Sequence, residues 1–235
     1  MTYTPDTPIP AAYMKTILGE PTLTSFWELQ ELSGTVAADS KGTNTGTYQN
    51  ALTLGSSGFA SGVVAINQGG TGYVTTTNSL TAPSIYSLEC LQYSGSSTNG
   101  GYICFTNTQT SNPTTIDRAL YLGSDTPKFD AHDTGGMITL SAPSTSTLSV
   151  WHHLVATYGT HGCMALYLDG VLIAFDPTAR TPQSYTGYWR LGDYTTNGGH
   201  NLFQWGFACA AVYSSALSPQ AVKRHFDAMR AQTLT

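Results

Sequence analysis

The chain has 235 residues, of which 40% are hydrophobic and only 10% are charged, and its formal net charge is −5. This length suits one domain with a sizeable core and is too short for two β-sandwiches of ordinary size, while the apolar share excludes a disordered chain. The nine Lys and Arg residues are scattered singly except at Lys223-Arg224, which argues against a nucleic-acid partner. No apolar stretch approaches 18 residues, so we expect no membrane insertion.

The first residues differ in composition from the rest of the chain. Pro5, Pro8 and Pro10 predict a stiff, extended arm, which we bound at residues 1–22, with one domain over 23–235. Residues 11–19 are compatible with a short helix. No basic start followed by an apolar run is present, so we expect no secretory signal.

Short alternating segments separated by Gly-rich turns follow, as in an all-β domain. We predict that the long segments 84–93 and 101–106 form one antiparallel pair. Other strands are predicted at 24–32, in short pieces through 54, and at 63–66, 73–75, 119–123, 128–131, 185–191 and 203–213, with the pieces at 119–123 and 128–131 forming a pair.

Residues 150–175 predict three consecutive antiparallel strands. Asp169-Gly170 supplies the positive φ angles that a two-residue hairpin needs. Side chains alternate across the first of these strands, so His152 and His153 lie on opposite faces. Both faces carry apolar residues, which indicates one face on the core and the other on a covered sheet surface. A C-terminal helix is predicted over 218–231, because Ser218 caps it and Pro219 occupies its first turn.

Several of these segments resemble one family. Trp151 to Tyr158 followed by Leu166 to Gly170 is similar to the signature of laminin-G-like jelly rolls in the concanavalin A-like lectin/glucanase superfamily. Further similar segments come in the order that the family requires: Phe26 to Gly42, Ser87 to Leu91, Leu191-Gly192 and Ala211 to Ser218. The resemblance implies an antiparallel two-sheet jelly-roll β-sandwich with one short C-terminal helix. It implies little about function, because this fold hosts lectins, hydrolases, adhesion modules and structural domains.

No catalytic constellation is found. Glucanases of this superfamily carry acidic residues in an E-x-D-x-x-E pattern on one strand, and that pattern does not occur here. Glu28 and Glu31 are three apart in a predicted strand, hence on opposite faces, and we interpret them as residues that frame the opening strand. We therefore expect no enzyme, with a glycoside hydrolase as the least favoured alternative.

Metal binding and disulfides are left open by the sequence. Many relatives hold calcium through Asp, Asn and backbone oxygens in loops. Asp39 with Asn44 is one candidate site here and Asp193 with Asn197 another, although loops of this composition also use such residues for turns alone. We therefore expect no cofactor, with calcium as the alternative. The four cysteines favour buried free thiols, and a Cys90–Cys104 disulfide is a second interpretation.

Aromatic residues in and beside two loops carry the functional signal. Sugars bind proteins through apolar ring faces laid on Tyr or Trp, with polar side chains at the rim. The candidate ligand-binding residues form one set around 192–200 and another around 94–101: Asp193, Tyr194, Asn197, His200 and Trp205 in the first, and Tyr93, Asn99 and Tyr102 in the second.

We therefore predict a non-catalytic carbohydrate-binding or adhesion protein with surface glycans as partners. The family resembled acts mostly outside cells, and a chain without a secretory signal would reach that location by cell lysis. The alternative is that a secretory signal has been removed from the sequence. The prediction is a phage virion accessory protein of capsid or tail, located in the virion or outside the cell and forming a homo-oligomer with capsid or tail proteins as partners. A purely structural virion protein is the alternative.

Overall fold

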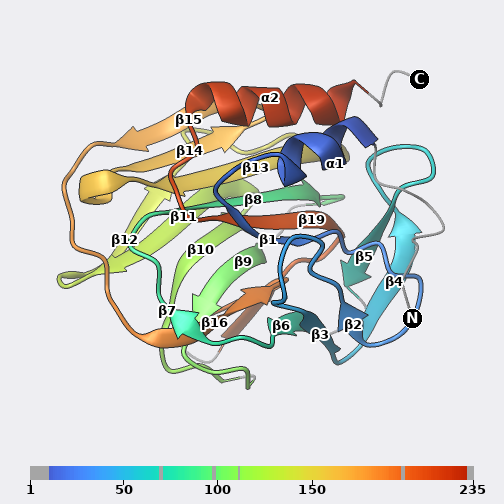
Figure 1. Ribbon diagram of the computed structural model, residues 1–235, viewed down its shortest axis with the longest axis horizontal. Helices are drawn as coiled ribbons and strands as arrows, with labels where there is room; N and C mark the ends of the chain where they lie inside the picture. Colours follow the sequence, from blue (N-terminus) through green and yellow to red (C-terminus); the bar gives the residue numbers. More distant parts are fainter. Residues whose placement is uncertain (1–10, 69–70, 97–98, 111, 197–198, 232–235) are drawn as a thin grey trace.

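The computed structural model describes residues 11–68, 71–96, 99–110, 112–196 and 199–231. Two β-sheets pack face to face, and two helices lie across the outer face of one of them (Figure 1). Among the described residues every strand pairing is antiparallel except one residue pair between β18 and β9. The expected antiparallel jelly-roll sandwich is confirmed.

Sheet A is the sheet that the helices cover. Its main path runs β15-β14-β13-β8-β19-β5-β4, and β1 pairs with β19. The strands are β1 (Leu23–Trp27), β4 (Leu52–Ser57), β5 (Val64–Gln68), β8 (Tyr86–Tyr93), β13 (Trp151–Tyr158), β14 (Met164–Leu168), β15 (Val171–Asp176) and β19 (Gly206–Tyr213).

Sheet B lies on the other side of the core. Its main path runs β12-β11-β10-β9-β16-β6-β3-β2, with β7, β17 and β18 attached. The strands are β2 (Val36–Ala37), β3 (Gly46–Gln49), β6 (Tyr73–Thr76), β7 (Leu80–Thr81), β9 (Gly100–Thr106), β10 (Ile116–Gly123), β11 (Thr126–Asp133), β12 (Gly136–Ser141), β16 (Thr186–Leu191), β17 (Asp193–Thr196) and β18 (Gly199–Leu202).

The three-strand segment folds as its sequence pattern predicts. Strands β13, β14 and β15 pair in succession, and Asp169 and Gly170 take φ angles of 52° and 77° in the hairpin between β14 and β15. The inner face of β13 contributes Leu154 and Ala156 to the core between the sheets, while Val155 on its outer face packs beneath the helices. The covered outer face explains why both faces of this strand are apolar.

The predicted pairing of 84–93 with 101–106 is wrong. Strand β8 lies in sheet A between β13 and β19, whereas β9 lies in sheet B between β10 and β16. The loop between them therefore crosses from one sheet to the other. Local alternation predicts that a segment is a strand, but it does not say which distant strand will be its neighbour. The predicted pair at 119–123 and 128–131 is confirmed as β10 and β11.

Two helices, one from each end of the described chain, cover the outer face of sheet A. Helix α2 (Pro219–Arg230) begins after Ser218, whose Oγ accepts a hydrogen bond from the Ala221 amide at 3.1 Å. Helix α1 (Ala11–Leu18) lies beside it (Figure 1), and its Tyr13 and Ile17 side chains are fully buried against sheet A. Residues 11–18 of the predicted arm thus form a helix that packs on the sandwich, and the part of the arm over 1–10 lies outside the described residues. A short 3-10 turn, Thr160–Gly162, links β13 to β14.

Neither helix in the described part of the chain is long and apolar enough to cross a bilayer. The four cysteines Cys90, Cys104, Cys163 and Cys209 are free thiols. Cys90 belongs to the core between the sheets, and Cys104 lies in a separate small cluster with Ala119 and Tyr194. Burial raises the pKa of both of these thiols. The interpretation as buried thiols is the one that the structure supports.

Candidate functional site

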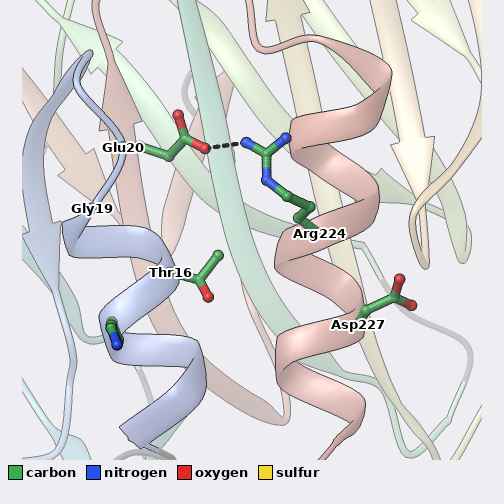
Figure 2. A pocket seen from close by; sticks show the side chains of 6 residues that line it. Thr16, Gly19, Glu20, Arg224 and Asp227 are labelled. Atoms are coloured by element: carbon green, nitrogen blue, oxygen red, sulfur yellow. Dashed lines mark hydrogen bonds and ion pairs between the residues drawn. The ribbon is translucent and has the colours of Figure 1, made fainter.

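One hollow of the molecule lies between the helices, and we call it the helix groove (Figure 2). It has a volume of about 550 Å³ and is lined by Lys15, Thr16, Gly19, Glu20, Arg224 and Asp227. Arg224 Nη2 lies 2.7 Å from Glu20 Oε1, and Lys223 Nζ lies 2.6 Å from the Asp227 carboxylate. Among the described lining residues there is no aromatic ring on which a sugar could stack.

A second hollow lies at one end of sheet A, and we call it the aromatic pocket. Its volume is about 300 Å³, and it is lined by Ser57, Gly58, Asn67, Tyr93, Trp151, Trp205 and Gly206. Three aromatic side chains share this small space with a hydroxyl and an amide. That combination of ring faces and neutral hydrogen-bonding groups is typical of sugar-binding sites.

Strand register explains why these residues meet. Strands β13, β8, β19 and β5 are consecutive neighbours in sheet A. Trp151 at the start of β13 pairs with Tyr93 at the end of β8, and Gly206 at the start of β19 pairs with Asn67 on β5. Antiparallel neighbours bring the end of one strand beside the start of the next. Residues distant in the sequence thus meet at a single end of the sheet.

Trp205 is the platform of the aromatic pocket. A Cβ atom built on Gly95 would lie 2.9 to 3.0 Å from Cδ2, Cε2 and Cε3 of the Trp205 ring. Cδ2 is bonded to the other two atoms and to Cγ, so a point equally close to all three lies over the flat of the indole. One face of Trp205 therefore rests on the Gly95 backbone. The side chain is still 38% exposed and lines the aromatic pocket, so part of the ring remains accessible to a ligand.

Trp151 forms the supporting wall. Its ring centroid lies 5.8 Å from that of Tyr93 and 6.2 Å from that of Phe59, which in turn lies 6.2 Å from Tyr13 on α1. A Cβ atom on Gly206 would come within 2.7 Å of the Trp151 ring, so glycine is required for this close approach. A rigid row of aromatic rings thus connects the pocket to the helix-covered face.

Two of the predicted binding residues meet in this pocket, although they came from different loops. Tyr93 belongs to the set around 94–101 and Trp205 to the set around 192–200. The structure also adds three lining side chains that were not among the candidates: Trp151, Asn67 and Ser57. The signal for Trp151 was an aromatic residue at the first position of a strand, where a side chain reaches the rim of the sheet.

Other predicted binding residues lie inside the protein. Tyr194 is buried and donates a hydrogen bond to Asp130, with its ring 4.7 Å from that of Tyr121. Asp193 is buried within 3.1 Å of Arg190 Nη1. Burial raises the pKa of the Tyr194 hydroxyl, and the neighbouring Asp130 carboxylate raises it further. These side chains hold β17 against sheet B, and we leave them out of the candidate site.

The remaining candidates fall into three groups. Tyr102 is buried in the core and donates to Gln92 Oε1 at 3.1 Å. Asn99 is exposed, and its Oδ1 accepts from the Ser124 amide at 2.8 Å, which fixes the turn after β10. His200 belongs to β18, but its side chain lies outside the described part, as does the whole of Asn197.

The candidate calcium residues serve a turn. Asp39 Oδ1 accepts from the amides of Phe26, Lys41 and Gly42, and Oδ2 accepts from the Asn44 amide, at 2.9 to 3.1 Å. Such backbone donors are the ordinary partners of an Asp that closes a loop. Within the described residues, no group of three or more His, Cys, Asp or Glu side chains could hold a metal ion.

A buried polar network that the sequence did not predict lies beneath the helices. The carboxylate of Glu89 on β8 contacts four side chains from four different elements. These are Tyr13 at 3.0 Å, His153 at 2.8 Å, Tyr213 at 2.6 Å and His225 at 2.8 Å. All five side chains are buried to 1% exposure or less. We call this the Glu89 network; no ligand can reach it without opening the helices.

Glu89 and His225 change each other's pKa in the Glu89 network. Burial alone would raise the pKa of Glu89, but His225 and His153 outweigh it and bring that pKa well below its usual range. Burial alone would lower the pKa of His225, but Glu89 and Glu20 raise it above its usual value. Opposite charges stabilised in this way fix α2 on sheet A.

The sequence of the chain matches one known family. The profile described as concanavalin A-like lectin/glucanases superfamily, of laminin-G type, matches residues 68–223, about two thirds of the chain. The chain belongs to this superfamily. A search of curated proteins found no match.

Solved structures with a similar fold include proteins that were solved with bound sugars. Trypanosoma rangeli sialidase in complex with sialic acid is 11% identical with a TM-score of 0.62, over 89% of this chain and 33% of that chain. Domain 4 of an extracellular arabinanase from Geobacillus stearothermophilus, in complex with arabinotriose, is 16% identical with a TM-score of 0.56, over 87% and 98%. The binding domain of Paraclostridial mosquitocidal protein 1 is 12% identical with a TM-score of 0.59, over 87% and 52%.

These identities establish a shared fold and no more. The chain spans about a third of the length of the sialidase chains, whereas it corresponds to nearly the whole of the arabinanase domain. A similar sandwich therefore forms one part of the sialidase chain, and it forms nearly the whole of domain 4 of the arabinanase.

Proposed function

We propose that this chain is a non-catalytic carbohydrate-binding domain and that the aromatic pocket is its sugar site. The observation that carries the proposal is Trp205, which rests one face on Gly95 and is still 38% exposed in the lining of the pocket. An indole that is held in place and still partly exposed offers a platform for the apolar face of a sugar ring. Asn67 and Ser57 supply donors and acceptors for hydroxyl groups at its rim.

Solved structures with a similar fold support a role in sugar recognition. The sialidase was solved with sialic acid and the arabinanase domain with arabinotriose, and each sugar belongs to that protein. This chain shares their fold. The chemistry of the aromatic pocket provides the reason for extending sugar binding to this chain.

We propose a non-catalytic domain because of where the carboxylates lie. Glycoside hydrolysis usually requires two carboxyl groups that flank the scissile bond. The described lining of the aromatic pocket has neither Asp nor Glu. Glu31 accepts from the Ala38 amide at 2.8 Å and the Tyr48 hydroxyl at 2.6 Å, and Glu28 accepts from Ser40. Both residues thus hold the opening loops, which supports the interpretation as framing residues.

For biological context, we propose that the domain is an accessory part of a phage virion that contacts host surface glycans. Its low content of charged residues and its many hydroxyl and amide side chains suit a surface that touches glycans outside cells. Capsid or tail proteins and further copies of the chain would be its partners there. Finding the protein in purified particles by mass spectrometry tests this context separately from sugar binding.

The experiment for the sugar site is a glycan array followed by titration calorimetry on the best ligand. Trp205→Ala should weaken binding by about 1–3 kcal/mol, roughly 5- to 150-fold, if its stacking is comparable with that of aromatic platforms for bases. Phe175→Ala is the matched control, because Phe175 is 56% exposed on β15 and lies outside the pocket lining. Equal binding by the Trp205→Ala variant and wild type would exclude the aromatic pocket as the sugar site. A folded wild type that binds no glycan would exclude sugar binding and leave a purely structural role for the protein.

A further inference from the structure

The lining of the aromatic pocket indicates which class of sugar it takes, a step that rests on the proposed function. We propose that this pocket selects uncharged sugars, taking a single ring against the exposed part of Trp205, and discriminates against sugars that carry a carboxylate. The composition of the pocket wall disfavours a carboxylate, and the volume of the pocket limits the ligand to one ring.

The wall of the pocket offers no partner for an anion. Its described side chains that can hydrogen-bond are Ser57, Asn67, Tyr93 and the two indoles, all neutral donors or acceptors. A carboxylate brought from water against these rings loses hydration, and no cation in the described lining compensates for the loss. Hydroxyl groups lose much less, because a neutral amide or hydroxyl replaces their water partners.

Three arginines in the described part of the chain are engaged away from this pocket. Arg190 is buried beside Asp193 and lies over the Tyr73 ring, and Arg118 is buried against Asp117. Arg224 lines the helix groove, where Glu20 pairs with it. The formal net charge of −5 adds a mild repulsion for any anionic ligand.

The dimensions of the pocket favour one ring. A volume of about 300 Å³ is at the lower end of the range of small-molecule sites, roughly 300–1,000 Å³. At most one face of the Trp205 indole can take a sugar ring, because the other rests on Gly95. A chain end or a single exposed residue of a glycan therefore fits this geometry, while the remainder of the glycan extends into solvent.

The test uses the full chain and matched sugars that differ by a carboxylate. Suitable pairs are glucose with glucuronic acid and galactose with galacturonic acid, measured by saturation-transfer NMR and calorimetry. The neutral member of at least one pair should bind at least tenfold more tightly, with little dependence on salt between 50 and 500 mM. Acidic members that bind as tightly as the neutral ones, or more tightly, would overturn the selectivity.

A gain-of-function variant separates selectivity from binding itself. Ser57→Arg places a cation at the exposed rim and should narrow the neutral-to-acidic ratio at low salt, mainly by strengthening the acidic member. If acidic sugars win in wild type but lose binding in Trp205→Ala, the proposed function stands and the charge inference is wrong. If no neutral or acidic sugar binds the folded protein, both the proposed function and this inference are wrong.

Discussion

Nδ1 of His225 on α2 lies 2.8 Å from Oε2 of Glu89 on β8, although 136 residues separate them in the sequence. Nε2 of the same ring lies 3.1 Å from Glu20, which follows α1. One imidazole thus connects the last helix to a central strand and to the segment that precedes the first strand. The outer layer of the domain depends on this polar contact as well as on apolar packing.

Glu89→Gln should destabilise the domain. Removing one partner of a buried ion pair leaves an uncompensated charge, so we expect a loss of about 3–5 kcal/mol in the free energy of unfolding. Urea denaturation followed by circular dichroism measures it. Asp227→Asn is the control, since its exposed pair with Lys223 should be worth less than about 1 kcal/mol.

A second variant covers the case in which Glu89→Gln does not fold. Tyr213→Phe removes a single 2.6 Å hydrogen bond to Glu89 and should cost about 1–3 kcal/mol. If both variants remain as stable as wild type, the Glu89 network does not hold the helices.

Stability should depend on pH at both ends of the range. The pKa of Glu89 is lowered in the folded state, so its contribution is present above the ordinary value of about 4.5 and is lost as pH falls through the lowered pKa. The pKa of His225 is raised, so its contribution is fully present below about 6.5 and is lost as pH rises through the raised pKa. Both contributions are complete between those two values.

Thermal unfolding of wild type and His225→Gln from pH 3 to pH 9 tests this dependence. The variant should lose less stability than wild type between pH 6 and pH 9. Some dependence should remain, because Asp169 raises the pKa of His152 despite its burial. Parallel curves for the two proteins would contradict the assignment to His225.

Gly95→Ala should weaken sugar binding without removing any group that touches the ligand. The added methyl would come within 2.9 to 3.0 Å of the Trp205 ring, so the indole must move from its seat. We expect a loss comparable with that of Trp205→Ala, measured by calorimetry. Ser96→Ala, at the adjacent exposed position, should bind as wild type does. Unchanged sugar binding in Gly95→Ala would mean that the contact of the Trp205 ring with Gly95 is not needed for binding.

Calcium removal should leave stability unchanged. The oxygens of Asp39 are engaged by four backbone amides, so we expect the same melting temperature in EDTA and in millimolar calcium. Asp39→Ala should lower the free energy of unfolding by about 1–3 kcal/mol in both conditions, because those amides lose their acceptor. A calcium-dependent rise in the melting temperature of wild type would instead support the calcium site.

Local patterns were sufficient for several elements. The hairpin at Asp169-Gly170 needs two positive φ angles between neighbouring strands, and the start of α2 needs the Ser218 cap, so both are encoded within a few residues. The alternation of His152 and His153 is equally local. His152 contacts Asp169 and Thr147, while His153 on the other face contacts Glu89.

The choice of aromatic residues could be predicted only in part. Sequence composition marks Tyr194, Tyr102, Tyr93 and Trp205 alike as aromatic residues near Gly-rich loops. Burial separates them, because Tyr194 and Tyr102 are covered by strands that come from elsewhere in the chain, whereas Trp205 rests on Gly95 and is still partly exposed. Side chains of one type thus acquire different roles from contacts that no local pattern records.

The sequence by itself determined that this is an all-β sandwich with a capped C-terminal helix, because strand alternation, turn chemistry and capping act over two to four residues. Only the tertiary structure decided that β8 and β9 lie in different sheets and that Tyr93, Trp151 and Trp205 share one pocket. Strand order depends on packing between segments tens of residues apart, where many pairings satisfy the same backbone hydrogen bonds and the burial of the whole core selects among them.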